Sequence, residues 1–269
     1  MTRALTRNDL LGRTIEEFLR LGAEALREEY RFTRKAAQSW TSNVKGRIKE
    51  ADALLEKIAG YDIEVVSAAD ANYPRRIEAI DPDPPGVLFL YGNARLLDSD
   101  TFCVMSSRNS PEGAIGQIEQ TVEEGVLAGG VLVSGHDTPE YRHAAVVPLR
   151  WGAPRVLVLD SGFFQVFGPN LNEEPFRAAR LWRYKFDAKT DLAVTWVSPE
   201  AGYHRNSNRI RDRLVAALSN RLNFVTVAPG GNMERLAKQA LRAGRAVKVS
   251  PKAEQYGALA ALGAKELST

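Results

Sequence analysis

Short apolar runs alternate with longer amphipathic segments over most of the chain. The apolar runs predict strands at Phe102–Met105, Val131–Val133, Val156–Leu159, Leu192–Val197, Phe224–Val227 and Ala246–Val249. Between them, apolar residues at helical spacing predict helices at Gly113–Leu127, Glu140–Leu149, Asn208–Leu218 and Met233–Ala243. Strands that are apolar throughout and alternate with helices are typical of a parallel sheet covered on both faces. We therefore expect an α/β fold: a Rossmann-like, doubly wound, mainly parallel sheet with helices on both faces.

The first third of the chain has a different pattern. Residues 1–60 carry apolar positions at helical spacing with charged residues on the other faces, which predicts an N-terminal helical segment. We interpret it as a cap or dimer arm, with a dedicated nucleic-acid module as the alternative. Residues 61–93 are rich in turn residues and end in a short predicted strand, Val87–Tyr91, so they form a linker segment. Residues 94–269 make up the Rossmann-like domain.

Composition narrows the class of protein. The 269 residues are 44% hydrophobic and 26% charged, with a net charge of +3, which permits a polyanionic partner without requiring one. The single cysteine, Cys103, excludes an intrachain disulfide and favours a reducing compartment. One cysteine and three histidines cannot form a Cys/His zinc cluster. No apolar run approaches a membrane span of about 18 residues, and no secretory signal is evident. We expect a cytoplasmic protein with no metal, cofactor or membrane contact.

Small and polar residues follow the predicted strands. Ligands of doubly wound sheets bind beyond the carboxyl ends of the strands, where serine and glycine allow backbone N–H groups to approach a phosphate and Arg108 can grip it. The candidates are Ser106, Ser107, Arg108, Ser134, Gly135, His136, Gly230, Gly231 and Asn232. Each alone also fits a tight turn, but together they favour a phosphate site. The three-glycine dinucleotide pattern and the Walker lysine are absent, so an NAD dehydrogenase or ATPase is not expected.

A dense arginine run is the second feature. Arg205, Arg209 and Arg213 are four residues apart, which places them on one face of a helix, whereas Arg211 points elsewhere. Tyr203 precedes the run. A basic stripe beside an aromatic ring suits a single nucleic-acid strand, and the alternative is a solubilising helix face.

Other reactive residue types give weaker signals. Glu200 and Glu234 are the acids nearest the expected cleft and are weak candidates for a general base. Glu234 is explained more simply by its place in the first turn of a helix. We expect Cys103 to be inert in the core. We expect the tryptophans at positions 151, 182 and 196 to be packing residues.

The order of these motifs resembles the DprA/Smf family of DNA-processing proteins, within a Rossmann-like group that includes the cytokinin-activating LOG proteins. The most specific match is Arg211–Ser219, which is similar to the family's Arg-Asn-Arg-Ile-Ile-Ala-Gly-Leu-Ser helix. Val104–Arg108 stands where the family has a Val-Gly-Ser-Arg phosphate loop, and Val133–Gly135 resembles its Ser-Gly element. The resemblance covers about residues 73 to 267.

The resemblance implies a non-enzymatic protein that binds single-stranded DNA in DNA uptake or recombination, protects the strand, forms a homodimer and loads a RecA-type recombinase. It implies that Arg108 grips a phosphate, that Tyr203 approximates the stacking aromatic, and that Arg211 and Arg213 line or brace the site. The chain departs from the family pattern at Ser106, where the family has glycine, and at Gly230–Asn232. The family's C-terminal winged helix is not expected.

Two alternatives remain. The first alternative is a nucleotide phosphoribohydrolase with Glu234 or Glu200 as the general base. It is based on a similarity between a LOG loop and Pro229-Gly230-Gly231 followed by Glu234. The second alternative is a sensor that binds a small nucleotide in the same cleft.

Overall fold

The computed structural model describes residues 10–68, 70–108, 110–204 and 207–267. The chain forms two compact units. Unit 1 comprises Met1–Tyr73 and Asp83–Leu88, and unit 2 comprises Pro74–Pro82 and Phe89–Thr269. The predicted linker segment, residues 61–93, is thus shared between the units. The division into domains at residues 60 and 93 stays a prediction.

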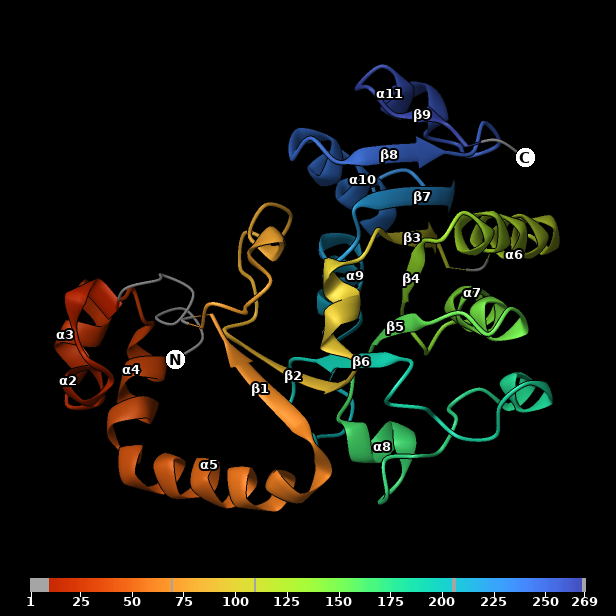
Figure 1. Cartoon of the computed structure of the whole chain (residues 1–269). Coiled ribbons are helices and arrows are strands. Elements are labelled where there is room, and N and C mark those ends of the chain that lie inside the picture. The colour runs from red at the N-terminus through yellow and green to blue at the C-terminus, as the bar shows by residue number, and fades with distance from the viewer. Residues whose placement is uncertain (1–9, 69, 109, 205–206, 268–269) are drawn as a thin grey trace. The chain divides into compact units, whose positions relative to one another are not determined.

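Unit 1 contains the expected N-terminal helices. These are α2 (Ile15–Leu19), α3 (Ala23–Glu28), α4 (Arg34–Thr41) and α5 (Val44–Ile58), followed by β1 (Ile63–Ser67) (Figure 1). Threonine side chains begin two of them: Thr14 forms a capping box with Glu17 at α2, and Thr33 caps α4. A small hydrophobic cluster holds the short helices together; it consists of Phe18, Leu26, Tyr30, Ala37 and Trp40.

The sheet of unit 2 is built from the predicted apolar runs. Its strands are β2 (Val87–Gly92), β3 (Thr101–Ser106), β4 (Val131–Ser134), β5 (Arg155–Val158), β6 (Leu192–Thr195), β7 (Arg221–Thr226), β8 (Ala246–Val249) and β9 (Lys265–Glu266). Within unit 2 the strand order is β2-β6-β5-β4-β3-β7-β8-β9. From β6 to β9 every neighbouring pair is parallel, whereas β2 pairs with β6 in antiparallel register. The expected mainly parallel, doubly wound sheet is confirmed.

Helices cover both faces of this sheet (Figure 1). On one face, α6 (Glu112–Leu127) and α7 (Pro139–Arg150) pack against β3 and β4 through buried residues such as Phe102, Ile118 and Val147. On the other, α9 (Ser207–Ala217) contacts β5, and α10 (Asn232–Arg242) contacts β7 and β8. Two short helices, α8 (Phe163–Phe167) and α11 (Tyr256–Ala260), complete the unit. The strand order reverses between β3 and β7, so the crevice for a ligand lies beyond their carboxyl ends.

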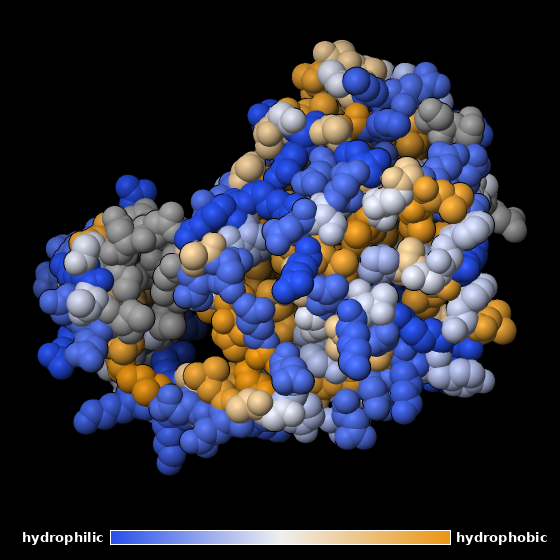
Figure 2. All heavy atoms as spheres, viewed as in Figure 1, coloured by the Kyte–Doolittle hydropathy of each residue, from blue (hydrophilic) through white to orange (hydrophobic). Residues whose placement is uncertain are grey.

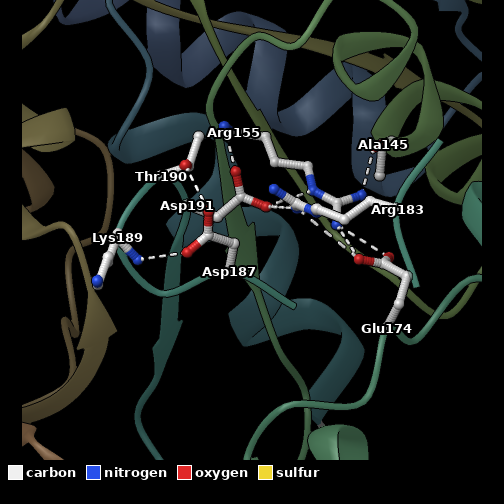
Figure 3. Close-up of polar contacts among 8 residues, drawn as sticks. All are labelled: Ala145, Arg155, Glu174, Arg183, Asp187, Lys189, Thr190 and Asp191. Carbon is white, nitrogen blue, oxygen red and sulfur yellow. Dashed lines mark hydrogen bonds and ion pairs between the residues drawn. The ribbon is translucent and has the colours of Figure 1, made fainter. Parts of the chain in front are cut away.

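A buried charge network fastens the long connection between β5 and β6 (Figure 3). Arg155 is fully buried; its Nε donates to Asp191 at 3.0 Å and its Nη2 to Glu174 at 2.7 Å. Its Nη1 donates to the carbonyl of Ala145 in α7 at 2.7 Å. Arg183 reaches the same two carboxylates. Two guanidinium groups thus balance two buried carboxylates. The network fixes residues on both sides of the segment 175–182.

The residues predicted to lie in the core differ in how deeply they are buried. Cys103 is fully buried, and burial raises the pKa of its thiol to about 12, so the expectation of an inert cysteine is confirmed. The packing expectation is wrong for Trp151 and Trp182, which are 51% and 44% exposed. Trp151 follows the last residue of α7, and Trp182 follows the 3₁₀ helix at Arg177–Leu181.

Hydrophilic residues cover most of the face shown in Figure 2, with hydrophobic residues between them, as in an ordinary folded domain. Among the described residues, no helix is both long and apolar enough to cross a membrane.

Candidate functional site

A pocket of about 340 Å³ opens beyond the carboxyl ends of β3 and β7, at the point where the strand order reverses. It brings together many of the residues predicted from the sequence: Ser106, Ser107, Arg108, Arg209, Arg211, Gly231 and Asn232. Residues that the sequence analysis did not single out complete its lining: Thr138, Tyr141, Asn208, Asp212, Ala228 and Met233. The pocket therefore draws on the end of β3, the start of α7, and the N-terminal turns of α9 and α10.

Hydroxyl groups lock the loop after β3 in place. The Ser106 hydroxyl shares hydrogen bonds with Thr226 at 2.6 Å and with Ser110 at 2.8 Å. The Ser107 N–H donates to Thr226 at 3.0 Å, and the Ser107 hydroxyl accepts from the N–H of Ala228 at 3.0 Å. The backbone amide of Ser107 is thus already used inside the protein. The serines shape the loop, and the arginine that follows them is the group left to meet an anion.

Arg108 and Arg209 are the exposed cations of this pocket. Neither forms an ion pair with a carboxylate in the described part of the chain. With its amide turned so that both contacts are satisfied, Asn208 accepts from Arg108 through its oxygen and donates to Asp160 through its nitrogen at 3.1 Å. Arg211 and Asp212 in the lining neutralise each other, so the positive charge of the lining comes from Arg108 and Arg209. This arrangement attracts an anion.

Arg211 lies beneath the pocket rather than on its rim. Its side chain is 1% exposed and forms ion pairs with Asp137 and, at 2.9 Å, with Asp212. The guanidinium carbon lies 4.7 Å from the ring centre of Tyr141, a cation–π contact. The prediction that Arg211 points into the fold is therefore correct. Because the two aspartates neutralise its charge, Arg211 braces the site rather than making it more positive.

The Asp212 carboxylate is the central acceptor among the side chains that support the pocket from below. It accepts from the Tyr141 hydroxyl at 2.9 Å and from the Asn232 amide at 2.7 Å, besides pairing with Arg211. Burial and the nearby Asp212 carboxylate raise the pKa of Tyr141 well above its usual value, so the phenol stays protonated and donates. α7, α9 and α10 are thereby joined around one carboxylate.

Ser134 and Gly135 support the pocket from behind. Ser134 is fully buried, and its hydroxyl donates to the carbonyl of Tyr141 at 3.4 Å. A Cβ at Gly135 would lie 2.7 Å from the Tyr141 ring and 2.8 Å from the Arg211 side chain. Glycine is required here because the two side chains pack against the backbone, and both predicted residues thus act through packing.

His136 faces away from this lining. Its Nε2 lies 3.7 Å from Asp160. Burial, together with the charges of Arg211 and Arg142, lowers the pKa of His136 to about 4, so the imidazole is neutral at pH 7.

The predicted basic stripe on α9 is not continuous. Arg205 lies outside the described residues. Arg209 reaches the pocket, but Arg213 pairs at 2.9 Å with the fully buried carboxylate of Asp81, because residues 74–82 pack against this face of α9. Tyr203 is 55% exposed and does not belong to the pocket lining.

The two weak candidates for a general base do not fit that chemistry. Glu234 accepts from the N–H of Gly230 at 2.6 Å and pairs with Lys238 at 2.5 Å. These contacts, led by that with Lys238, lower the pKa of Glu234, so its carboxylate stabilises the start of α10. Gly230 adopts a left-handed φ of 67°, which suits glycine. Glu200 is exposed and lies outside the pocket lining.

Some of the missed residues carried a usable signal. Asp212 is the one acid within the arginine run, and a lone acid between Arg211 and Arg213 indicates a bracing ion pair. The sequence carries no such signal for Thr226 or Tyr141, because each becomes part of the site only when β7 and α7 are placed beside β3.

Comparisons with known proteins agree with this fold. The family model of DNA recombination-mediator protein A matches residues 64–267. The fold is similar to DNA processing protein A from Streptococcus pneumoniae, with a TM-score of 0.71 and 19% identity over 99% of this chain and 88% of that one. It is also similar to DNA processing protein A from Helicobacter pylori, a protein that binds single-stranded DNA, with a TM-score of 0.55 and 18% identity over 71% of this chain and 82% of that one.

No curated protein matches the chain in sequence. The family model nevertheless covers well over half of the residues. The chain therefore belongs to the DNA recombination-mediator protein A family.

Proposed function

We propose that this protein binds single-stranded DNA at the pocket beyond β3 and β7 and acts as a DNA-processing protein in DNA uptake or recombination. The observation that carries the proposal is the pair of exposed arginines, Arg108 and Arg209, at the rim of a concave site at the reversal point of the sheet. Family membership and the likeness to a protein that binds single-stranded DNA support it.

The expected binding mode is contact with the strand's backbone. Arg108 and Arg209 meet phosphates as charge-assisted donors, while Arg211, neutralised by Asp137 and Asp212, supports the floor of the pocket. Tyr141 is buried under Arg211 and is not available for stacking on a base. Binding through phosphates is independent of base sequence and strongly dependent on salt.

The test is fluorescence anisotropy with a labelled oligo-dT of about 20 nucleotides at two salt concentrations, repeated with excess mononucleotide. Arg108→Ala combined with Arg209→Ala is expected to weaken binding at least about tenfold at low salt. The same variant should lower the slope of the salt dependence by about 1.4, since each phosphate that an arginine neutralises on a single strand accounts for roughly 0.7.

Arg242→Ala is the matched control, because Arg242 is exposed in the last turn of α10, outside the pocket lining. Binding that is unchanged in the double variant, or equally weakened in the control, contradicts the proposal. Displacement of the oligonucleotide by mononucleotide would favour the sensor alternative instead.

Homodimer formation and the loading of a RecA-type recombinase extend this proposal. Sedimentation velocity tests the first: the expected species has twice the 29.7 kDa chain mass. Strand-exchange assays with and without the protein test the second. We also propose a cytoplasmic location, supported by the single buried thiol of Cys103.

A further inference from the structure

A second pocket, larger than the first, lies on the other side of the loop between β4 and α7. It has a volume of about 530 Å³, within the range of small-molecule sites. One wall is α7, with Arg142, His143 and Arg150, and the opposite wall is the segment 175–182, with Phe176, Arg177 and Trp182. Nothing in the proposed strand-binding role uses this pocket.

The charge of this second pocket is positive and only partly neutralised. Its single carboxylate, Glu119, is shared between His143 at 2.7 Å and Arg150 at 2.9 Å. Arg142 donates its Nε to the carbonyl of His136 at 3.4 Å, and its two terminal nitrogens have no ion pair with a carboxylate in the described part of the chain. Arg177 is exposed and has no ion pair with any described carboxylate. Two guanidinium groups are therefore available to one anion.

The remaining lining suits a flat, apolar group. Val146, Pro175 and Phe176 contribute apolar surface. The Trp182 ring is 44% exposed, and the guanidinium of Arg150 lies 5.6 Å from its centre. The Arg150 guanidinium lies over one face of the indole, and a nucleobase can stack on the outer side of this cation–aromatic pair. Phosphate-binding arginines and a stacking surface thus occur in one cavity.

The second wall is held in place by the buried charge network (Figure 3). Glu174 directly precedes the lining segment and Arg183 directly follows its last member, Trp182. Both are fixed through Arg155 and Asp191, and the Arg155 guanidinium also lies 5.3 Å from the Phe176 ring centre. A segment tied at both ends and again at Phe176 gives a wall that is ordered before any ligand arrives. His136 lines the same pocket, and its buried Nδ1 has no hydrogen-bond partner in the described part of the chain.

We propose that this cavity is a second binding site that takes one nucleotide unit, with its phosphate on Arg142 and Arg177 and its base on the surface formed by Trp182 and Arg150. The unit comes either from a free mononucleotide or from a DNA strand. The site is independent of the proposed strand-binding pocket, since Arg108 and Arg209 belong to the first cavity only.

Calorimetric titration of the full chain with dAMP tests the proposal, with tryptophan fluorescence as a second readout. Saturable binding with quenching is expected. Arg142→Ala combined with Arg177→Ala should weaken it at least about tenfold. Trp182→Phe should remove the quenching, because Trp182 is the tryptophan that lines the cavity.

Two control variants decide where the nucleotide binds. Arg180→Ala removes an exposed arginine from the same 3₁₀ helix, η5 (Arg177–Leu181), outside the cavity, and Arg108→Ala disables the first pocket. Both should bind dAMP as the unaltered protein does. The proposal is overturned by absence of saturable binding, by an equal loss in Arg180→Ala, or by a loss confined to Arg108→Ala. If oligo-dT displaces bound dAMP in the Arg108→Ala variant, the strand is the source of the nucleotide; if it does not, the source is a free nucleotide.

Discussion

Neighbouring arginines on one helix have different environments and therefore different roles. Arg209 is exposed at the rim of the first pocket, Arg211 is buried between two aspartates, and Arg213 pairs with a buried carboxylate. Helical spacing predicts correctly that Arg211 points away from the other two. It cannot predict the partner of Arg213, because Asp81 is more than one hundred residues away in the sequence and its segment reaches α9 only in the fold.

Arg213→Ala is expected to lower the free energy of unfolding by about 2–4 kcal/mol, because it removes a cation from a fully buried carboxylate. Urea denaturation measures this change in the free energy of unfolding. Arg209→Ala, at an exposed position on the same helix, should change stability by no more than about 0.5 kcal/mol. Equal stabilities for the two variants would show that the ion pair between Arg213 and Asp81 contributes nothing to the free energy of unfolding.

The buried imidazole of His136 predicts a loss of stability in mild acid. Its pKa in the folded protein is about 4, below the ordinary value of 6.5, so between these pH values the unfolded chain binds more protons. The free energy of unfolding therefore falls as the pH decreases from 6.5 towards 4, by at most about 3 kcal/mol. The raised pKa of the neighbouring Asp160, caused mainly by burial, acts in the opposite direction.

Urea unfolding at several pH values tests this contribution in the unaltered protein and in His136→Gln. The variant should lose the part of the pH dependence that lies between pH 6.5 and 4. Parallel curves for the two proteins would assign the acid sensitivity to other groups.

At the scale of elements, apolar runs predict the sheet and its main helices well. Every strand predicted from β3 to β8 is present. The central strands β3 to β6 are buried on both faces and largely apolar, whereas β8 alternates exposed and buried residues. The structure of the connection between β5 and β6 could not be predicted from apolar runs. Charged residues such as Arg155, Glu174 and Asp191 normally indicate solvent, yet here they are fully buried and neutralise one another.

Arg155→Met should destabilise the protein by about 3–5 kcal/mol, since it leaves Glu174 and Asp191 buried with only Arg183 to balance them. Thermal and urea unfolding measure the change, and the exposed Arg180→Ala is the control. A loss below about 1 kcal/mol would mean that buried water or local movement compensates. The same variant should also weaken dAMP binding, because the network orders the wall of the second pocket.

At the scale of the whole molecule, the chain has two units with separate hydrophobic clusters. We expect them to respond separately to core substitutions. Leu26→Ala, at a fully buried position, should cost about 2–5 kcal/mol within unit 1. Hydrogen exchange should then quicken in α2 to α5 and stay unchanged in β3 to β8. Quickening throughout the chain would show that the units unfold as one.

The candidate site was predictable in its location more than in its chemistry. The strand-end rule selects the loops after β3 and β7, and Arg108, Arg209 and Asn232 line one pocket there. The roles of Ser134, Gly135 and Arg211 depend on packing against Tyr141, which no local pattern reveals. The second pocket was not predicted, because its walls come from α7 and from a segment without regular periodicity.

The interruption of unit 1 by residues 74–82 has a consequence for biosynthesis. Unit 1 lacks its last segment, Asp83–Leu88, until that stretch has left the ribosome, and the Tyr73 hydroxyl then donates to the carbonyl of Pro85 at 2.6 Å. Unit 1 is complete once Leu88 has emerged, long before β7 and β8 of the central sheet exist. Since amino-terminal units fold first during translation, the nascent chain carries a finished unit 1 while the strands of unit 2 still await their partners.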